Sequence, residues 1–221
     1  MAESMDTGTD TERQPPYFSD TRVFWDVVDF PLPLDGDLDR FCLNVNVAIS
    51  NERFVGEVEF YAYGDELSNQ DRMEIRRAGI WLKQEGAEKR ERLNRMLLDV
   101  LEYAHYNRDP ADANFLIAMK DIPEIDTKLF SIMQALRQKG YEVWFVVPDD
   151  CPSSQVPDFD TATLVWRCSI LREGGYPIYE PSESDSDDEG SALAAKKRQN
   201  EEGSSQGAEK LQKITDDDGA Q

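Results

Sequence analysis

The sequence predicts an α/β fold: a doubly wound, mainly parallel sheet of about five strands with helices on both faces. The first observation behind this prediction is a short, almost wholly apolar run at residues 22–28, which is typical of a strand buried on both sides. The second is that such runs alternate with segments of helical periodicity along the chain. This alternation indicates β-α-β units, whose crossovers are right-handed.

Apolar spacing and turn residues give the expected elements in order. Helices are predicted where apolar residues recur every three or four positions, and strands where short apolar runs end at Gly, Pro or Asp. The predicted elements are a strand at 22–28, a helix at 37–51, a strand at 57–63, a short element at 72–77, a strand at 79–82, a long helix at 87–106, a strand at 113–119, a helix ending near 140, a strand at 141–147 and one further strand within 161–171.

The length of 221 residues fits one domain with tails. We expect a disordered N-terminal segment at 1–20, because it is polar and ends in two prolines. The folded domain is expected at 21–148, followed at 149–179 by a linker with the additional strand. Residues 180–221 lose apolar periodicity and carry a serine-acid run, so they predict an acidic disordered tail.

The formal charge of −21 is not confined to the tails. Residues 1–20 carry five acids and one base, residues 180–221 carry twelve acids and five bases, and −10 remains for residues 21–179. An acidic body argues against tight, salt-resistant nucleic-acid binding through a broad basic face. It leaves open a nuclease whose acids hold a divalent cation, because bound metal offsets their charge.

The three cysteines are widely spaced and form no CxxC pair. A disulfide framework and a structural zinc site are therefore not expected. No apolar run approaches the length of a membrane span, and the N-terminus has no signal-peptide core. These features predict a soluble intracellular protein.

Acidic residues stand at the ends of predicted strands. Asp26 lies within the first apolar run, Asp29 follows it, and Asp121 follows the fourth strand. If these strands are neighbours, their carboxylates meet at one sheet edge, where such groups bind Mg²⁺ or Mn²⁺. Asp99 and Asp65 are further candidates. The alternative is that acids stand at strand ends because loops are polar.

Five blocks of the sequence occur in a characteristic order. They are Phe24-Trp25-Asp26-Val27-Val28-Asp29-Phe30-Pro31-Leu32-Pro33, Tyr61-Ala62-Tyr63-Gly64-Asp65, Ala78-Gly79-Ile80, Arg92-Leu93-Asn94-Arg95-Met96-Leu97-Leu98-Asp99 and Ala113-Asn114-Phe115-Leu116-Ile117. Together they resemble the NYN domain of limkain type, the meiosis regulator and mRNA stability factor class, with the best agreement to its plant members. The resemblance covers residues 21–148 and implies a PIN-like Rossmannoid fold with metal-dependent endoribonuclease activity.

The resemblance also implies roles for individual residues. Asp26 matches the first metal-binding acid, Asp29 the Asn or Asp three residues later, Asp99 the helical acid, and Asp121 the acid of a Ser-Gly-Asp turn. On this basis Asp26, Asp99 and Asp121 are expected to be catalytic, and all four acids to hold Mg²⁺ or Mn²⁺. The implied substrate is single-stranded RNA.

Several residues depart from the family pattern. Met119-Lys120 stands where the family has Ser-Gly, Val28 stands for its usual Glu, and Phe30 stands for its usual Cys. Glycine allows close backbone approach that lysine restricts. Lys120 either neutralises Asp121 or contacts a phosphate. Glu124 and Asp126, which lie further along the chain, are both candidates for the family's next acid.

The densest basic cluster of the body is Lys89, Arg90, Arg92 and Arg95. It either follows an RNA backbone, with Arg92 and Arg95 joining Lys120 as substrate-binding residues, or forms a solvated helix face, which we favour. Arg95 and Asp99, four residues apart, have the spacing of an ordinary surface ion pair. The four tryptophans are predicted to fill the core rather than to stack on bases: Trp25, Trp81, Trp144 and Trp166.

Two functions from different classes are consistent with these features. The first is a metal-dependent endoribonuclease-like NYN protein that acts on single-stranded RNA and regulates mRNA stability. The second is a catalytically degenerate NYN domain that binds RNA or, through its acidic tail, protein partners. A phosphohydrolase of the haloacid-dehalogenase type ranks lower, because it needs Asp-x-Asp and Asp26 and Asp29 lie one residue too far apart. The expected compartments are cytoplasm or nucleus, and the family association adds the peroxisome, although no terminal Ser-Lys-Leu is present.

Overall fold

The computed structural model describes residues 15–64, 67–84, 88–120, 127–158 and 160–178. The predictions for residues 1–14 and for the acidic tail at 180–221 lie outside the described residues. So do those for Asp65, for Asp121 and for the two acids that follow it, Glu124 and Asp126. Among the described residues, no helix combines the length and the apolar character needed to cross a membrane.

The centre of the described domain is a six-stranded sheet in which every neighbouring pair is parallel, in the order β3-β2-β1-β4-β5-β6. The predicted α/β fold is confirmed, and the additional strand expected within residues 161–171 forms the sixth strand. The strands are β1 (Asp20–Asp26), β2 (Val58–Gly64), β3 (Ile80–Gln84), β4 (Ala113–Ala118), β5 (Glu142–Val147) and β6 (Leu164–Arg167).

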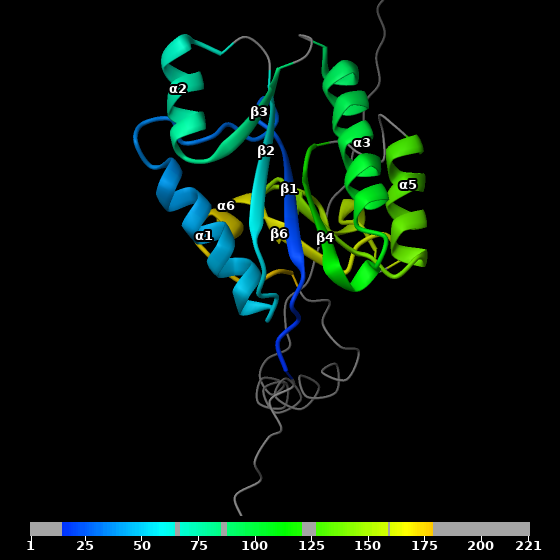
Figure 1. Cartoon of the computed structure of the whole chain (residues 1–221). Helices are drawn as coiled ribbons and strands as arrows, with labels where there is room; N and C mark the ends of the chain where they lie inside the picture. Colours follow the sequence, from blue (N-terminus) through cyan, green and yellow to red (C-terminus); the bar gives the residue numbers. More distant parts are fainter. Residues whose placement is uncertain (1–14, 65–66, 85–87, 121–126, 159, 179–221) are drawn as a thin grey trace, which may run out of the picture. The chain divides into compact units, whose positions relative to one another are not determined.

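Helices cover both faces of the sheet, as predicted (Figure 1). Side chains of a strand alternate between faces, so β1 sends Val23 and Trp25 to one core and Phe24 to the other. On the first face lie α1 (Leu38–Asn51), α2 (Asn69–Arg77) and α6 (Cys168–Arg172), and on the second lie α3 (Lys89–Tyr106) and α5 (Thr127–Gln138). The last helix, α6, occupies part of the segment expected to be strand.

Local sequence explains where the helices begin and how they pack. In α1 the buried residues recur at helical spacing, which gives the helix one apolar stripe against the sheet: Leu38, Phe41, Val45, Ala48 and Ile49. Ser68 starts α2 through a capping box. Its hydroxyl oxygen accepts the backbone N–H of Asp71, and the Asp71 carboxylate accepts the backbone N–H of Ser68. The short element predicted at 72–77 is thus the last six of the nine residues of α2.

A close backbone approach occurs just before β1 and β2. A Cβ atom added at Gly56 would lie 2.2 Å from the carbonyl oxygen of Ser19. Beside this contact, Thr21 donates its backbone N–H to the Glu57 carbonyl oxygen. Only glycine fits here, and it sets the register in which the first two strands pair.

The predicted role of the tryptophans is confirmed for three of the four. Trp25, Trp144 and Trp166 are buried in the core on the α1 face. The prediction is wrong for Trp81, which is 60% exposed. The reason is topological: Trp81 lies on the α3 face of the edge strand β3, and α3 packs over β1 and β2 instead, so the described core on this face contains no residue of β3.

The strand order reverses between β1 and β4, because the chain first winds outward to β3 and then returns to β4. In open α/β sheets the ligand crevice lies at the carboxyl ends of the strands at such a switch point. Asp26 is the last residue of β1, and Lys120 lies two residues beyond the end of β4. This edge of the sheet is therefore the place to look for a functional site.

Candidate functional site

Asp26 is completely buried at the end of β1 and has its charge matched within the protein. Its Oδ2 atom accepts a hydrogen bond from Nε of Arg92 at 3.0 Å. Its Oδ1 atom accepts two backbone N–H groups, from Val28 at 2.9 Å and Asp29 at 3.1 Å. Arg92 is itself only 3% exposed. The two residues form a buried ion pair with both carboxylate oxygens engaged.

Asp29 connects three chain segments at the switch point. Nζ of Lys89, at the start of α3, lies 2.9 Å from its Oδ2 atom. The same oxygen accepts the backbone N–H of Lys120 at 2.9 Å. The end of β1 is thereby tied both to α3 and to the segment that follows β4.

Asp99 belongs to a second buried group, farther along α3. The Tyr63 hydroxyl donates to its Oδ2 atom at 2.8 Å. Nε of Arg95 lies 3.3 Å from Oδ1, and Nζ of Lys83 lies 3.6 Å from Oδ2. Burial, and then the neighbouring Asp99 carboxylate, raise the pKa of Tyr63. The interpretation of Arg95 and Asp99 as a surface pair is wrong, because Asp99 is only 5% exposed.

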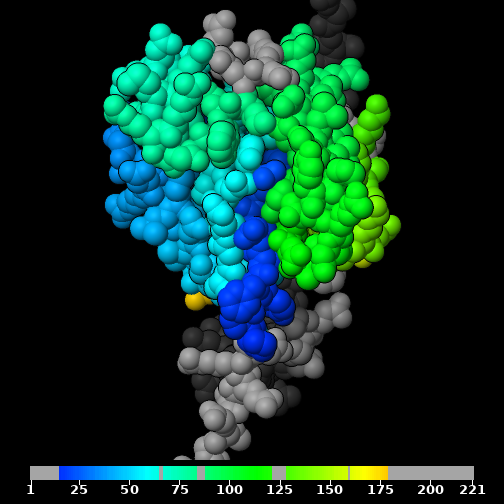
Figure 2. Space-filling model, viewed as in Figure 1, coloured from blue at the N-terminus to red at the C-terminus, as the bar shows by residue number. Residues whose placement is uncertain are grey.

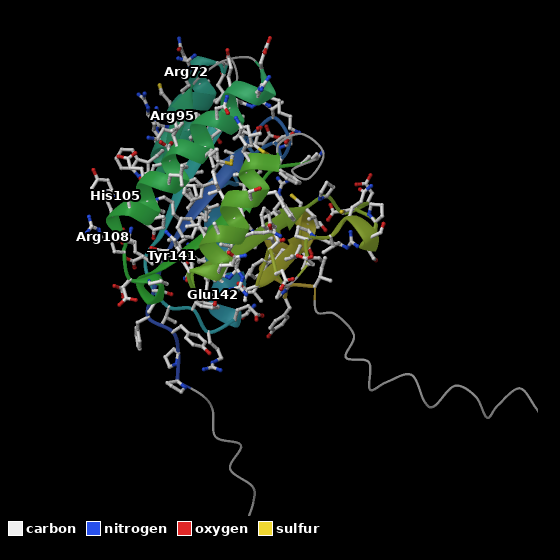
Figure 3. All side chains as sticks on the ribbon, turned by 90° about the vertical axis from the view of Figure 1, so that its right-hand side faces the viewer. Arg72, Arg95, His105, Arg108, Tyr141 and Glu142 are labelled. Atoms are coloured by element: carbon white, nitrogen blue, oxygen red, sulfur yellow. The ribbon has the colours of Figure 1, made fainter. Side chains whose placement is uncertain are left out.

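The basic cluster of α3 is not the solvated face that we favoured. Lys89, Arg92 and Arg95 are spaced three residues apart, so they lie on one side of the helix, and each is paired with an acid. Arg90 is exposed. Of the predicted substrate-binding residues, Arg92 contacts Asp26 in the interior, whereas Lys120 and Arg95 are half-buried. Figure 3 shows Arg95 on the same side of the molecule as Arg72 of α2.

Cations outnumber carboxylates in this group of described residues. The acids are Asp26, Asp29 and Asp99, and the cations are Lys83, Lys89, Arg92, Arg95 and Lys120. The chain as a whole carries −21. Within this group the cations exceed the carboxylates by two, whereas Asp149 and Asp150 add negative charge at the same edge directly beyond β5. The excess belongs to the α3 side of the carboxyl edge, which is where a polyanion would find cations.

The described acids do not form a metal centre as they stand. Among the described residues, no three Asp, Glu, His or Cys side chains come together in a way that could hold a metal ion. The backbone N–H of Asp29 donates a hydrogen bond to the Asp26 carboxylate, whereas the Asp99 carboxylate accepts its hydrogen bond from Tyr63. A metal ion at Oδ2 of Asp26 would have to displace the Arg92 guanidinium. The fourth predicted ligand, Asp121, lies outside the described residues.

A cavity of about 650 Å³ opens beside Lys120. Its walls come from the ends of β4 and β5, from α5 and from the loop at 148–158, and include Met119, Phe130, Val147 and Pro148. This volume is in the range of small-molecule sites. Nothing in the sequence indicates the cavity, because the loop at 148–158 has the composition of a linker.

The comparison with protein families decides the family. The NYN domain profile matches residues 20–161, more than half of the chain. The chain belongs to the NYN domain family. This is a PIN-like nuclease family, and membership supports an RNA-related nuclease function and RNA binding in general. Nucleases of this type generally use divalent metals. A comparison with curated proteins finds no match.

The sequence pointed to Asp26 and Asp29 and singled out Lys89 and Arg92 as basic residues, but it did not identify these cations as the partners of the two acids. The signal for Lys89, Arg92 and Arg95 was their three-residue spacing, which places all of them on one side of the helix. Lys83 has no signal of its own in the sequence, because its pairing with Asp99 depends on where α3 crosses the sheet.

Proposed function

We propose that this NYN domain is an endoribonuclease-like protein that acts on single-stranded RNA at the carboxyl edge of its sheet. The observation that carries the proposal is the group of cations that surrounds Asp26, Asp29 and Asp99 on the α3 side of the carboxyl edge, in an otherwise acidic NYN domain. RNA carries one negative charge per nucleotide, and its release of counterions drives binding to such a region.

The residues at this edge divide the work between positioning and contact. The Asp26–Arg92 pair is buried and fixes the end of β1 against α3. Asp29 holds the backbone of Lys120, so the lysine side chain starts from a fixed point at the end of β4. Lys120 and Arg95 are half-buried and are the proposed contacts to RNA phosphates.

The metal-dependent form of the proposal rests on the family. In that form Mg²⁺ or Mn²⁺ is held by Asp26, Asp29, Asp99 and Asp121, of which Asp26, Asp99 and Asp121 are catalytic. The described geometry favours this form less, because each of the three described acids already has a cation beside it. The wider proposal places the protein in the limkain-type class that regulates mRNA stability, in the cytoplasm, nucleus or peroxisome.

The second candidate function is an NYN domain that binds RNA or a protein partner without cutting. Two observations favour it: Arg92 sits in the interior against Asp26, and Lys120 stands where the family has glycine. In this proposal the binding domain is the whole sheet domain, from β1 to β6 and α6, which is larger than the 21–148 expected from the sequence. The acidic tail at 180–221 is the part that contacts partners and is regulated.

Cleavage of a labelled single-stranded RNA with Mg²⁺ or Mn²⁺ tests the proposal. The variants are Asp26→Asn, Lys120→Gly and, as a matched control, Lys139→Gly, an exposed lysine before β5 at the opposite edge of the sheet. Metal-dependent cutting by the wild type that Lys139→Gly retains and Asp26→Asn abolishes supports the nuclease, provided that circular dichroism shows Asp26→Asn to be folded at the assay temperature. Cutting by Lys120→Gly alone indicates a nuclease inhibited at this turn.

No cutting by any variant, with each variant shown to be folded by circular dichroism, contradicts the nuclease. Retained RNA affinity then supports the second candidate. Loss of both cutting and RNA binding overturns the proposed function as a whole.

A further inference from the structure

Four aromatic rings form a ladder across the α3 face of the sheet. Phe115 of β4 stacks on Phe24 of β1 at a centroid distance of 6.3 Å, with the ring planes 10° apart. Phe24 stacks on Tyr61 of β2 at 6.2 Å and 27°, and Tyr61 on Trp81 of β3 at 6.4 Å and 21°. The rings are nearly parallel from the centre of the sheet to its edge.

The ladder begins in the core and ends in solvent. Phe115 and Phe24 are completely buried beneath α3, Tyr61 is partly buried, and Trp81 is 60% exposed. Because β3 is an edge strand, no described strand continues the ladder beyond Trp81. Figure 2 shows atoms of β1 and β2 at the surface between α3 and the β3–α2 side. An aromatic ring that stacks on Trp81 would be the next member of the same series.

Cations flank the exposed end of the ladder. The Arg22 guanidinium lies 4.6 Å from the Tyr61 ring centroid, and Nζ of Lys83 lies 5.4 Å from it. Glu59 pairs with Arg22, and Asp99 with Lys83. Each cation that borders the rings thus already has one carboxylate partner. A ligand with flat rings can stack at this surface, and its phosphates would compete with Glu59 and Asp99 for the two cations.

The exposed rings lie close to the candidate site. Trp81 pairs with Tyr61 in the sheet, and the next residues on the same face are Lys83 and Tyr63, which contact Asp99. Two residues along a strand correspond to about 6.6 Å, which is close to the spacing of neighbouring nucleotides in an extended single strand. A strand of RNA at the carboxyl edge therefore reaches Trp81 within one or two nucleotides.

We infer that Trp81 and Tyr61 form a stacking platform for a base of single-stranded RNA, with Lys83 and Arg22 beside the sugar-phosphate backbone. The inference rests on the proposed function, because it takes RNA as the ligand of the neighbouring edge. It assigns base stacking to the β2–β3 surface. Stacking platforms of this kind tolerate any base, so the platform contributes affinity and position rather than sequence specificity.

The tryptophans provide a direct probe. Trp81 is the exposed one among the four tryptophans of the chain, and the other three are at most 1% exposed. Titration with an RNA of about twelve uridines should quench the exposed part of the emission. Trp81→Ala should lose the quenching and about tenfold in affinity, and Trp81→Phe should lose the quenching while keeping most of the affinity. Tyr176→Ala, which changes a side chain of equal exposure beyond α6, should match the wild type.

Three outcomes would overturn the inference. RNA binding by the wild type with unchanged affinity in Trp81→Ala places the RNA elsewhere, and leaves the proposed function standing. Absence of RNA binding by the wild type removes the proposed function itself. Sedimentation that shows a dimeric wild type and a monomeric Trp81→Ala would make the outer strand β3 an interface between two copies of the chain.

Discussion

Replacing Arg92 by leucine would remove the positive partner of a completely buried carboxylate. Asp26 is 0% exposed and Arg92 is 3% exposed, so water does not reach the pair to screen a lone charge. Removal of one partner of a buried pair costs about 3–5 kcal/mol. A domain of this size has a free energy of unfolding of about 5–15 kcal/mol. We therefore expect Arg92→Leu to lose a large part of its stability.

The double variant Asp26→Asn/Arg92→Leu should recover part of the loss, because it removes the unpaired buried charge. Asparagine keeps an oxygen at the position of Oδ1, which accepts the backbone N–H groups of residues 28 and 29, and it places no charge beside the leucine. The expected cost of the double variant is about 1–3 kcal/mol, because the Nδ2 amide of asparagine then lies buried without an acceptor. The two single changes are therefore strongly non-additive.

Urea unfolding followed by circular dichroism measures these differences, with Arg90→Leu as the control on the same turn of α3. Arg90 is exposed, so its replacement should change the free energy of unfolding by about 0.5 kcal/mol or less. A loss below about 1 kcal/mol in Arg92→Leu would refute the reasoning. It would mean that Asp26 is hydrated or bound to another cation in solution.

The same contacts lead to three further predictions. Because Arg92 occupies Oδ2 of Asp26, millimolar Mn²⁺ should raise the melting temperature of Arg92→Leu more than that of the wild type, and equal shifts in a thermal scan would argue against this arrangement. Tyr63→Phe should cost about 1–3 kcal/mol in urea unfolding, because it removes a hydrogen bond to the buried Asp99 carboxylate. Burial and the Asp99 carboxylate raise the folded-state pKa of Tyr63 above its value in the unfolded chain. The stabilisation from its hydroxyl is therefore fully present below pH about 10, the unfolded pKa, and is lost progressively at higher pH. An alkaline unfolding profile of Tyr63→Phe as steep as that of the wild type would contradict this. Gly56→Ala should cost about 1–3 kcal/mol, because its Cβ would lie 2.2 Å from the Ser19 carbonyl oxygen. Gly36→Ala serves as the comparison that carries backbone strain without a clash. A Cβ atom at this position meets nothing within 4 Å, but the residue has a φ of +93°.

The fold could be predicted because its signals are local. Apolar runs mark strands and apolar stripes mark helices, so the alternation of elements follows from the sequence alone. The sixth strand was also indicated, although no residue pattern showed that helix α6 would follow it directly. The exposure of Trp81 could not be predicted, because it depends on which strand lies at the edge of the sheet, and strand order is a long-range property.

The candidate site shows the same division. Asp26 stood out because a carboxylate inside a buried apolar run needs a partner. Arg92 as that partner is a tertiary contact across 66 residues, and only its place on the same side of α3 as Lys89 and Arg95 indicated it. Asp99 has the sequence pattern of a surface residue because its four-residue spacing from Arg95 is common on exposed helices, whereas here α3 places it beneath Tyr63.

The salt dependence of RNA affinity tests most directly that the carboxyl edge of the sheet binds RNA. Fluorescence anisotropy of a labelled single-stranded RNA would compare the wild type with Lys120→Glu and Lys139→Glu, which reverse one charge at the carboxyl edge and one at the opposite edge. Lys120→Glu should weaken binding for every RNA sequence and lower the slope of log K against log salt by about 0.7 for each phosphate that the protein no longer neutralises. Lys139→Glu should leave the slope unchanged. Equal effects of the two reversals would contradict an RNA site at this edge.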